Sequence, residues 1–259
     1  MSSPPKKIST RLIRKGALIE ESYKAFSAWE RSQSVAANLK RIFETNAVNA
    51  RNEAWLKEIV TTLSNRFSAH GKVGPLVTAV QAGLSLEKWK GCLLWHVGRT
   101  DLFYFLFATE WLFPEHGRGR FAIRSDEVVP FVRDVFKNSG GKIKALSEYG
   151  TVRAARDLLL MAKDFGLVEG NSTRHFLPYH IADEAFLYVL HAIAEDESNA
   201  RRIVESKDWR LFLMTPHDVE REILRLHQFQ KLRYDTAGTL AQLTLPFPTL
   251  QKYADSLYA

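Results

Sequence analysis

Cysteine is almost absent from this chain, whose 259 residues include a single one, Cys92. One cysteine excludes an intramolecular disulfide and any zinc site built from several thiolates. The residue lies in an apolar stretch between Lys90 and Trp95, so we expect a buried and unreactive thiol. A chain without disulfides suits a reducing compartment, and we expect a cytoplasmic protein.

Long hydrophobic runs are missing as well. The strongest candidate, Leu102–Phe113, is interrupted by Thr109 and Glu110 and is far shorter than the roughly 20 residues that a membrane span needs. We interpret it as a buried helix, with an interfacial membrane helix as the alternative. The N-terminal residues 1–7 lack the apolar core of a signal peptide, and we expect a flexible basic lead-in there.

The sequence motifs of common enzymes are also missing. There is no phosphate loop of the form G-x-x-x-x-G-K-[ST] and no G-x-G-x-x-G fingerprint. Two histidine–carboxylate pairs could form near helix ends without a nucleophile: His96 with Asp101, and Glu115 with His116. The acidic clusters at 126–127 and 195–197 suit helix ends better than a metal site. We therefore expect no catalytic residue, no metal and no cofactor.

The composition that is present is that of a soluble globular protein with a basic excess. Hydrophobic residues make up 46% and charged residues 25% of the chain. Lys and Arg number 36 against 29 Asp and Glu, which gives a net charge of +7. This excess favours an anionic partner, such as a phosphate backbone or an acidic surface.

Apolar residues recur mostly at helical spacing, so the sequence predicts a mainly α fold. Helices are expected over 19–29, 35–43, 49–67, 75–84, 85–97, 100–113, 125–136, 183–193 and 215–226. Glycines and arginines at Pro114–Arg120 indicate a boundary or an exposed flexible loop. Near the C-terminus the period changes to two, which predicts a β-hairpin from Leu232–Asp235 and Thr239–Leu245.

The segment from Lys142 to Ile181 has the pattern of a winged helix-turn-helix. A short helix is expected at 142–148, a turn at Tyr149–Gly150 and a longer helix at 151–165 capped by Thr151. Gly166 is expected to take a left-handed conformation, and strands at 167–169 and 174–181 then form the wing. We accordingly expect three domains: residues 1–115 (N-terminal helices), 116–182 (winged helix-turn-helix) and 183–259 (C-terminal helices with the hairpin).

Basic residues concentrate in this central segment. Residues 117–181 hold eleven Lys and Arg against seven Asp and Glu, a net charge of +4 out of the chain's +7. We expect the helix at 151–165 to approach the DNA major groove and the wing tip, with Arg174 and His175, to lie nearby. About five phosphate contacts would give a slope of about −4 to −5 for log affinity against log salt. The candidate DNA-binding residues are Lys142, Lys144, Thr151, Arg153, Arg156, Lys163, Arg174 and His175.

Several segments, taken together and in order, resemble the BrxA family of the BREX phage-exclusion systems of bacteria. They are Ser9–Leu18, Glu21–Tyr23, Asn49–Arg66, Leu146–Val152 with Leu158–Leu159 and Gly166–Leu167, and Ala237–Pro246. The resemblance implies a mostly helical, non-enzymatic protein that binds double-stranded DNA and works with other subunits of a phage-exclusion system.

Two other functions remain open at the level of sequence. The helical faces could dock partner subunits, so that the chain acts as a scaffold, and exposed aromatic residues around Phe103, Tyr104 and Trp111 would favour this role. A winged helix-turn-helix is also found in transcription regulators.

Overall fold

Helices account for most of the residues that the structure describes. The structure is a computed structural model, and it describes residues 8–68, 73–138, 145–238 and 240–258. Within these ranges, helices dominate and the only sheets are two small antiparallel ones, so the predicted mainly α fold is confirmed.

Five helices form the N-terminal part of the fold and match the predicted segments closely. They are α1 (Ile19–Ser27), α2 (Val35–Thr45), α3 (Glu53–Phe67), α4 (Val73–Gln81) and α5 (Leu86–Thr100). Polar side chains set two of the starts: Ser34 accepts a hydrogen bond from the backbone N–H of Ala37, and Asn52 accepts one from Trp55. Each bond satisfies a backbone donor that the helix leaves unpaired.

The apolar segment after α5 is a buried helix, as predicted. It runs through α6 (Leu102–Leu106), a π-helical turn η1 (Phe107–Leu112) and α7 (Phe113–Gly117). Phe103 and Tyr104 are fully buried and Trp111 is half-buried, so these aromatic residues do not form the exposed surface that would favour a scaffold. None of the described helices has the length and apolar character needed to cross a membrane.

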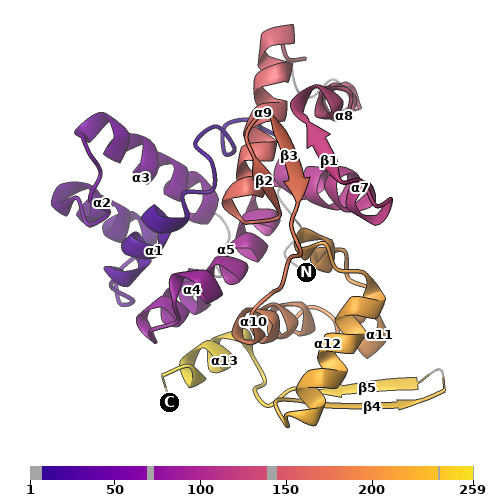
Figure 1. Cartoon of the computed structure of the whole chain (residues 1–259). Coiled ribbons are helices and arrows are strands. Elements are labelled where there is room, and N and C mark those ends of the chain that lie inside the picture. Colours follow the sequence, from indigo (N-terminus) through magenta and orange to yellow (C-terminus); the bar gives the residue numbers. More distant parts are fainter. Residues whose placement is uncertain (1–7, 69–72, 139–144, 239, 259) are drawn as a thin grey trace.

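The central part of the chain builds a helix pair against a three-stranded sheet (Figure 1). The elements are β1 (Ala122–Arg124), α8 (Ser125–Lys137), α9 (Glu148–Asp164), β2 (Val168–Gly170) and β3 (Thr173–Phe176). The sheet order is β1-β3-β2 and both pairings are antiparallel. The hairpin β2–β3 after α9 and the left-handed Gly166, with φ of 79°, confirm these two predicted features, while the winged helix-turn-helix as a whole stays a prediction.

The segment before β1 is more ordered than expected. Residues 114–117 belong to α7. Arg118 pairs with Glu115, and Arg120 pairs with both Glu115 and Glu127. The predicted exposed loop is therefore limited to residues 118–121, and carboxylates on α7 and α8 pair with the guanidinium groups of both of its arginines.

Helix α8 begins at Ser125, as predicted, and contains Pro130 in its interior. The predicted boundary between the short helix and the longer helix was wrong. The longer helix starts at Glu148, and its N-terminal cap is Ser147, whose hydroxyl accepts a hydrogen bond from the N–H of Gly150. The predicted turn at 149–150 therefore lies inside α9. Of the predicted short helix, residues 145–147 are not helical and 142–144 lie outside the described residues.

The C-terminal part returns to helices and ends in the predicted hairpin. Its elements are α10 (Asp183–Ala194), α11 (Ala200–Val204), the 3-10 helix η2 (Lys207–Phe212), α12 (Pro216–Gln228), β4 (Arg233–Ala237), β5 (Leu240–Thr244) and α13 (Leu250–Ser256). Thr215 and Asp218 form a reciprocal capping box at the start of α12, where Pro216 is the first helical residue.

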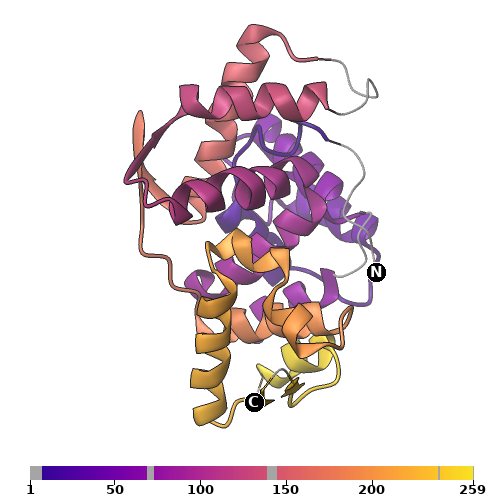
Figure 2. The same cartoon turned by 90° about the vertical axis from the view of Figure 1, so that its right-hand side faces the viewer.

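Helix α5 lies at the centre of the hydrophobic core, packed against α4, α10 and η2. Gly91 permits the crossing with α10, because a Cβ atom there would lie 2.8 Å from the Cβ of Ala185. Buried residues of the N-terminal, central and C-terminal parts form one cluster. The three domains expected from the sequence remain a prediction. In both views α8 and α9 lie at one end of the molecule, and α12 with the hairpin lies at the other (Figures 1 and 2).

Candidate nucleic-acid interface

Helix α9 presents a mixed basic and apolar stripe to the outside. The stripe consists of Tyr149, Arg153, Arg156, Leu160 and Lys163, which recur at spacings of four, three, four and three and so lie on one face. Two members of the stripe are large apolar side chains that reach solvent: Tyr149 is 75% exposed and Leu160 is 39% exposed. The other face of α9 is buried through Ala154, Leu158 and their neighbours. We call this set the α9 stripe.

The two arginines of the α9 stripe are both exposed, as predicted. The Nε atom of Arg153 lies 3.8 Å from an oxygen of Asp157, one turn further along α9. Burial raises the pKa of the Asp157 carboxyl, while Arg153 and Arg14 act in the opposite direction. Among the described residues, no carboxylate lies within ion-pair distance of Arg156. The structure therefore leaves Arg156 available to an external anion.

Lys163 links α9 to the β2–β3 hairpin. Its ammonium group donates a hydrogen bond of 2.6 Å to the side-chain oxygen of Asn171, in the turn between the strands. The side chain is half-buried, so its charge is near the surface but already has a partner.

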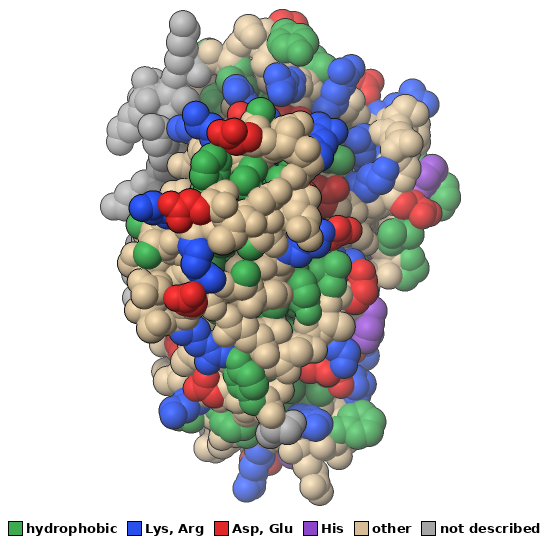
Figure 3. Space-filling model, turned by 90° about the vertical axis from the view of Figure 1, so that its left-hand side faces the viewer, with side chains coloured by type: hydrophobic (Ala, Val, Ile, Leu, Met, Phe, Trp, Pro, Cys, Tyr) green, Lys and Arg blue, Asp and Glu red, His purple; other side chains and the backbone are tan. Residues whose placement is uncertain are grey.

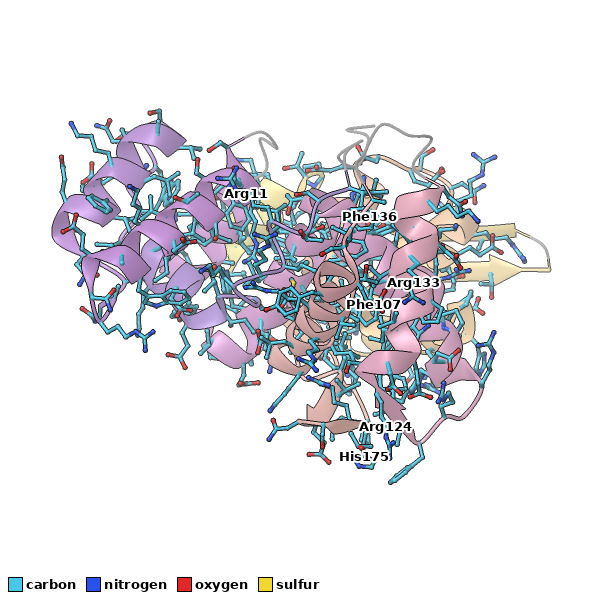
Figure 4. All side chains as sticks on the ribbon, turned by 90° about the horizontal axis from the view of Figure 1, so that it is seen from above. Arg11, Phe107, Arg124, Arg133, Phe136 and His175 are labelled. Atoms are coloured by element: carbon cyan, nitrogen blue, oxygen red, sulfur yellow. The ribbon has the colours of Figure 1, made fainter. Side chains whose placement is uncertain are left out.

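The predicted positions of Arg174 and His175 at the hairpin tip were wrong. The turn consists of Asn171 and Ser172, whereas both predicted residues lie in β3, the central strand. Arg174 pairs across the sheet with Ile123 of β1 and is 8% exposed, and burial lowers the pKa of its guanidinium. The ring of His175 packs against Phe121 at 4.8 Å. His175 and Arg124 lie together at an edge far from Arg11 (Figure 4).

One further candidate residue is buried, and two lie outside the described part of the chain. Thr151 is buried in α9, where its hydroxyl donates a hydrogen bond to the carbonyl of Ser147, so its predicted capping role was wrong. Lys142 and Lys144 lie outside the described residues. Of the eight candidate residues, the structure brings Arg153, Arg156 and Lys163 together on α9.

A basic cleft lies beside Arg153 and was not predicted. It is formed by α3, α9 and the N-terminal segment, has a volume of about 410 Å³, and is lined by Arg11, Arg14, Lys15, Lys57, Glu58, Thr61, Thr62, Asn65 and Arg153. Seen from above, Arg11 lies between the N-terminal helices and α9 (Figure 4). Basic side chains also gather along the upper part of the face that carries α1 to α3 (Figure 3). We call this set of nine residues the basic cleft.

The sequence held one signal that pointed to the cleft. Arg11, Arg14 and Lys15 are three cations within five residues, and they surround Ile13, which is fully buried. Cations around a buried residue indicate a docked segment with an exposed basic side. The sequence could not indicate that this segment lies against α9, which follows it by more than a hundred residues along the chain.

The residues examined for catalysis have structural contacts. The Nε2 atom of His96 lies 2.7 Å from the hydroxyl of Tyr188, and Asp101 caps α6 by accepting hydrogen bonds from Phe103 and Tyr104. Cys92 is fully buried, and burial raises the pKa of its thiol well above the usual range. Within the described part of the chain, no group of three or more His, Cys, Asp or Glu side chains is arranged to hold a metal ion.

Comparison with known proteins identifies the family of the chain. No curated protein and no solved structure matches it. The model of the BrxA family matches residues 6–192, a stretch that includes the N-terminal segment, α3 and all of the central helix pair and sheet. The match covers well over half of the sequence and agrees with the resemblance seen in its motifs. The chain therefore belongs to the BrxA family, whose members are components of BREX phage-defence systems.

Proposed function

We propose that this chain is a non-enzymatic component of its phage-defence system and binds double-stranded DNA through the α9 stripe. The observation that carries the proposal is the pair of exposed arginines, Arg153 and Arg156, on a helix whose opposite face is buried against the core. Guanidinium groups at this spacing can contact successive phosphates or the edges of guanine bases.

The surrounding elements support this role. Strand β1, helices α8 and α9, and the hairpin β2–β3 follow the order of a winged helix-turn-helix, with β1 pairing beside the hairpin. In such modules the second helix approaches the major groove and the hairpin lies over the adjacent backbone. Here Lys163 and Asn171 join the helix to the hairpin turn, which would keep the two at a fixed distance on DNA.

The exposed apolar members of the α9 stripe suit a groove better than solvent. Tyr149 lies in the first turn of α9, where helices of this class reach base edges, and its ring offers an apolar face for a thymine methyl group. The ion pair between Glu148 and Arg133 of α8 is on the surface and contributes little to stability. Arg133 is therefore free to exchange Glu148 for a phosphate.

Charge reversal on α9 tests the proposal. In a mobility-shift assay with duplex DNA, the double variant Arg153→Glu/Arg156→Glu should lose at least tenfold in affinity, because each contact to DNA is worth about 1–3 kcal/mol. The matched control is Arg201→Glu/Arg202→Glu on α11, which makes the same change in net charge at the other end of the molecule. Equal affinity of the two variants would contradict binding through α9.

A further inference from the structure

We propose that the basic cleft is a second binding site for the phosphate backbone of DNA, built on an N-terminal loop that is fixed in place before DNA arrives. The proposal rests on the proposed DNA binding by α9. It assigns the phosphate backbone as the ligand of residues 11–15 and Lys57, and it explains how the loop with residues 11–15 is held in place. Arg153 belongs to both the α9 stripe and the basic cleft, so the two surfaces are continuous.

The electrostatics of the cleft favour an anion. Its lining has five cationic side chains and one carboxylate, Glu58. Glu58 lies 3.4 Å from Lys15 and so pairs with one of the five. In the described part of the chain, no carboxylate lies within 4.0 Å of Arg11, Arg14 or Lys57. Three cations without an ion-pair partner on the walls of one cleft repel each other, and a phosphate between them relieves that repulsion.

The loop that carries Arg11 and Arg14 is held from the side of α3 by a buried cation. Arg66 is fully buried near the end of α3 and donates hydrogen bonds to the carbonyl oxygens of Ala17 at 2.6 Å, Gly16 at 2.7 Å and Leu12 at 2.9 Å. A guanidinium that is withdrawn from water needs such acceptors, so the loop and Arg66 depend on each other.

The same loop is held from the side of α9 by Asp164. One oxygen of this carboxylate accepts a hydrogen bond of 2.8 Å from the backbone N–H of Ala17. Gly16 makes the close approach possible, because its φ is +71° and a Cβ atom there would lie 2.6 Å from the same oxygen. The loop thus spans α3 and α9, and its position relative to Arg153 is set by both helices.

A fixed loop makes an effective phosphate site because the ordering of the backbone has already occurred in the free protein. Only the side chains of Arg11, Arg14 and Lys57 lose freedom on binding, which keeps the entropic cost low. The cations of the cleft are spread over the N-terminal segment, α3 and α9, and they continue into the α9 stripe at Arg153. They therefore suit an extended polyanion, the phosphodiester backbone, better than a single small anion.

Salt-dependent binding to duplex DNA tests the inference. Each phosphate contact makes the slope of log affinity against log salt more negative by about 0.9, so the variant Arg11→Ala/Arg14→Ala/Lys57→Ala should make the slope less negative by about 2 to 3. The control variant Arg201→Ala/Lys231→Ala/Lys252→Ala removes three exposed cations from the C-terminal part and should leave the slope unchanged.

A second pair of variants tests the fixed loop. Gly16→Ala forces a side chain against Asp164 and should make the slope less negative, as the triple variant does. Gly83→Ala is the control, because its φ is +86° but a Cβ atom there meets nothing within 4 Å.

A wild-type slope in the triple variant would overturn the inference while leaving α9 binding intact. Absence of any shift with the wild-type protein would instead overturn the proposed function and the inference with it. If Gly16→Ala fails to fold, the triple variant still decides.

Discussion

At the scale of single residues, burial shifts the pKa values of charged side chains in the interior of this protein. Arg66 and Asp101 are both buried, and burial lowers the pKa of Arg66 to about 10 and raises the pKa of Asp101 to about 6. Arg66 stays protonated at neutral pH, so it can hold the N-terminal loop. Asp101 changes its charge in a range that is easily reached in solution.

Asp101 should make the stability of the protein fall as pH rises from about 4 to about 7. In the unfolded chain this carboxyl loses its proton near 3.8, and in the folded chain near 6, so the folded state binds more protons between these values. The shift corresponds to roughly 3 kcal/mol, because one pKa unit is about 1.4 kcal/mol. Asp101→Asn keeps an oxygen that can accept from Phe103 and Tyr104 but cannot titrate. Urea unfolding should therefore show a smaller loss of stability between pH 5 and pH 7 in this variant.

The exposed Asp126 of α8 provides the control for this titration. Asp126→Asn removes a carboxyl from the surface and should leave the pH dependence of the wild-type protein unchanged. A wild-type pH dependence in Asp101→Asn would show that Asp101 does not titrate in this range.

At the scale of elements, the contact between α5 and α10 depends on a glycine. Gly91→Ala would place a Cβ atom 2.8 Å from Ala185 and 3.6 Å from Ile181, and both neighbours belong to well-packed parts of the core. Alanine favours the helix by about 1 kcal/mol, but overpacking costs about 1–3 kcal/mol, so the net change should be destabilising. The measurement is the free energy of unfolding in urea.

The matched control for Gly91→Ala is Gly117→Ala at the end of α7. Nothing lies within 4 Å of a Cβ atom at that position, so the variant should be as stable as the wild type or slightly more so. If Gly91→Ala proved as stable as Gly117→Ala, the two helices would not pack as closely as the structure has them.

Elements with strong local signals were predictable from the sequence, and those fixed by distant partners were not. Thr215 with Asp218 signals the start of α12, and the hairpin β4–β5 follows from its period of two. Ser147 and Thr151 both have hydroxyls that can cap a helix, and Gly150 between them predicts a turn. Only the hydrogen bond from the backbone N–H of Gly150 to the hydroxyl of Ser147 shows that Ser147 is the cap. Strand β1 has three residues and exists through its pairing with β3, so no local pattern indicates it.

The same distinction applies to the candidate interface. The face of α9 with Arg153 and Arg156 could be predicted because helical spacing alone separates it from the buried face. Arg174 could not be placed, because its burial follows from the pairing of β3 with β1. The basic cleft was hidden for a similar reason: it depends on hydrogen bonds from Arg66 and Asp164 to a loop far away in sequence.

At the scale of the whole molecule, the α9 stripe and the basic cleft share Arg153, so their basic groups continue from α9 to the N-terminal segment and α3. The C-terminal part, with α12 and its hairpin, lies at the other end and largely outside the residues matched to the family. Under the proposed function, DNA would therefore contact α9 and the basic cleft and would leave the end with α12 and the hairpin uncovered.

The most direct test of the account is the salt dependence of duplex DNA binding by the wild-type protein. Arg153, Arg156 and Lys163 of the α9 stripe, with the four further cations of the basic cleft, offer up to seven phosphate contacts. The dissociation constant should therefore rise steeply with salt, with a slope of about 4 to 6 on logarithmic axes. A dissociation constant that does not change with salt, or no binding at low salt, would contradict the claim that this surface holds DNA.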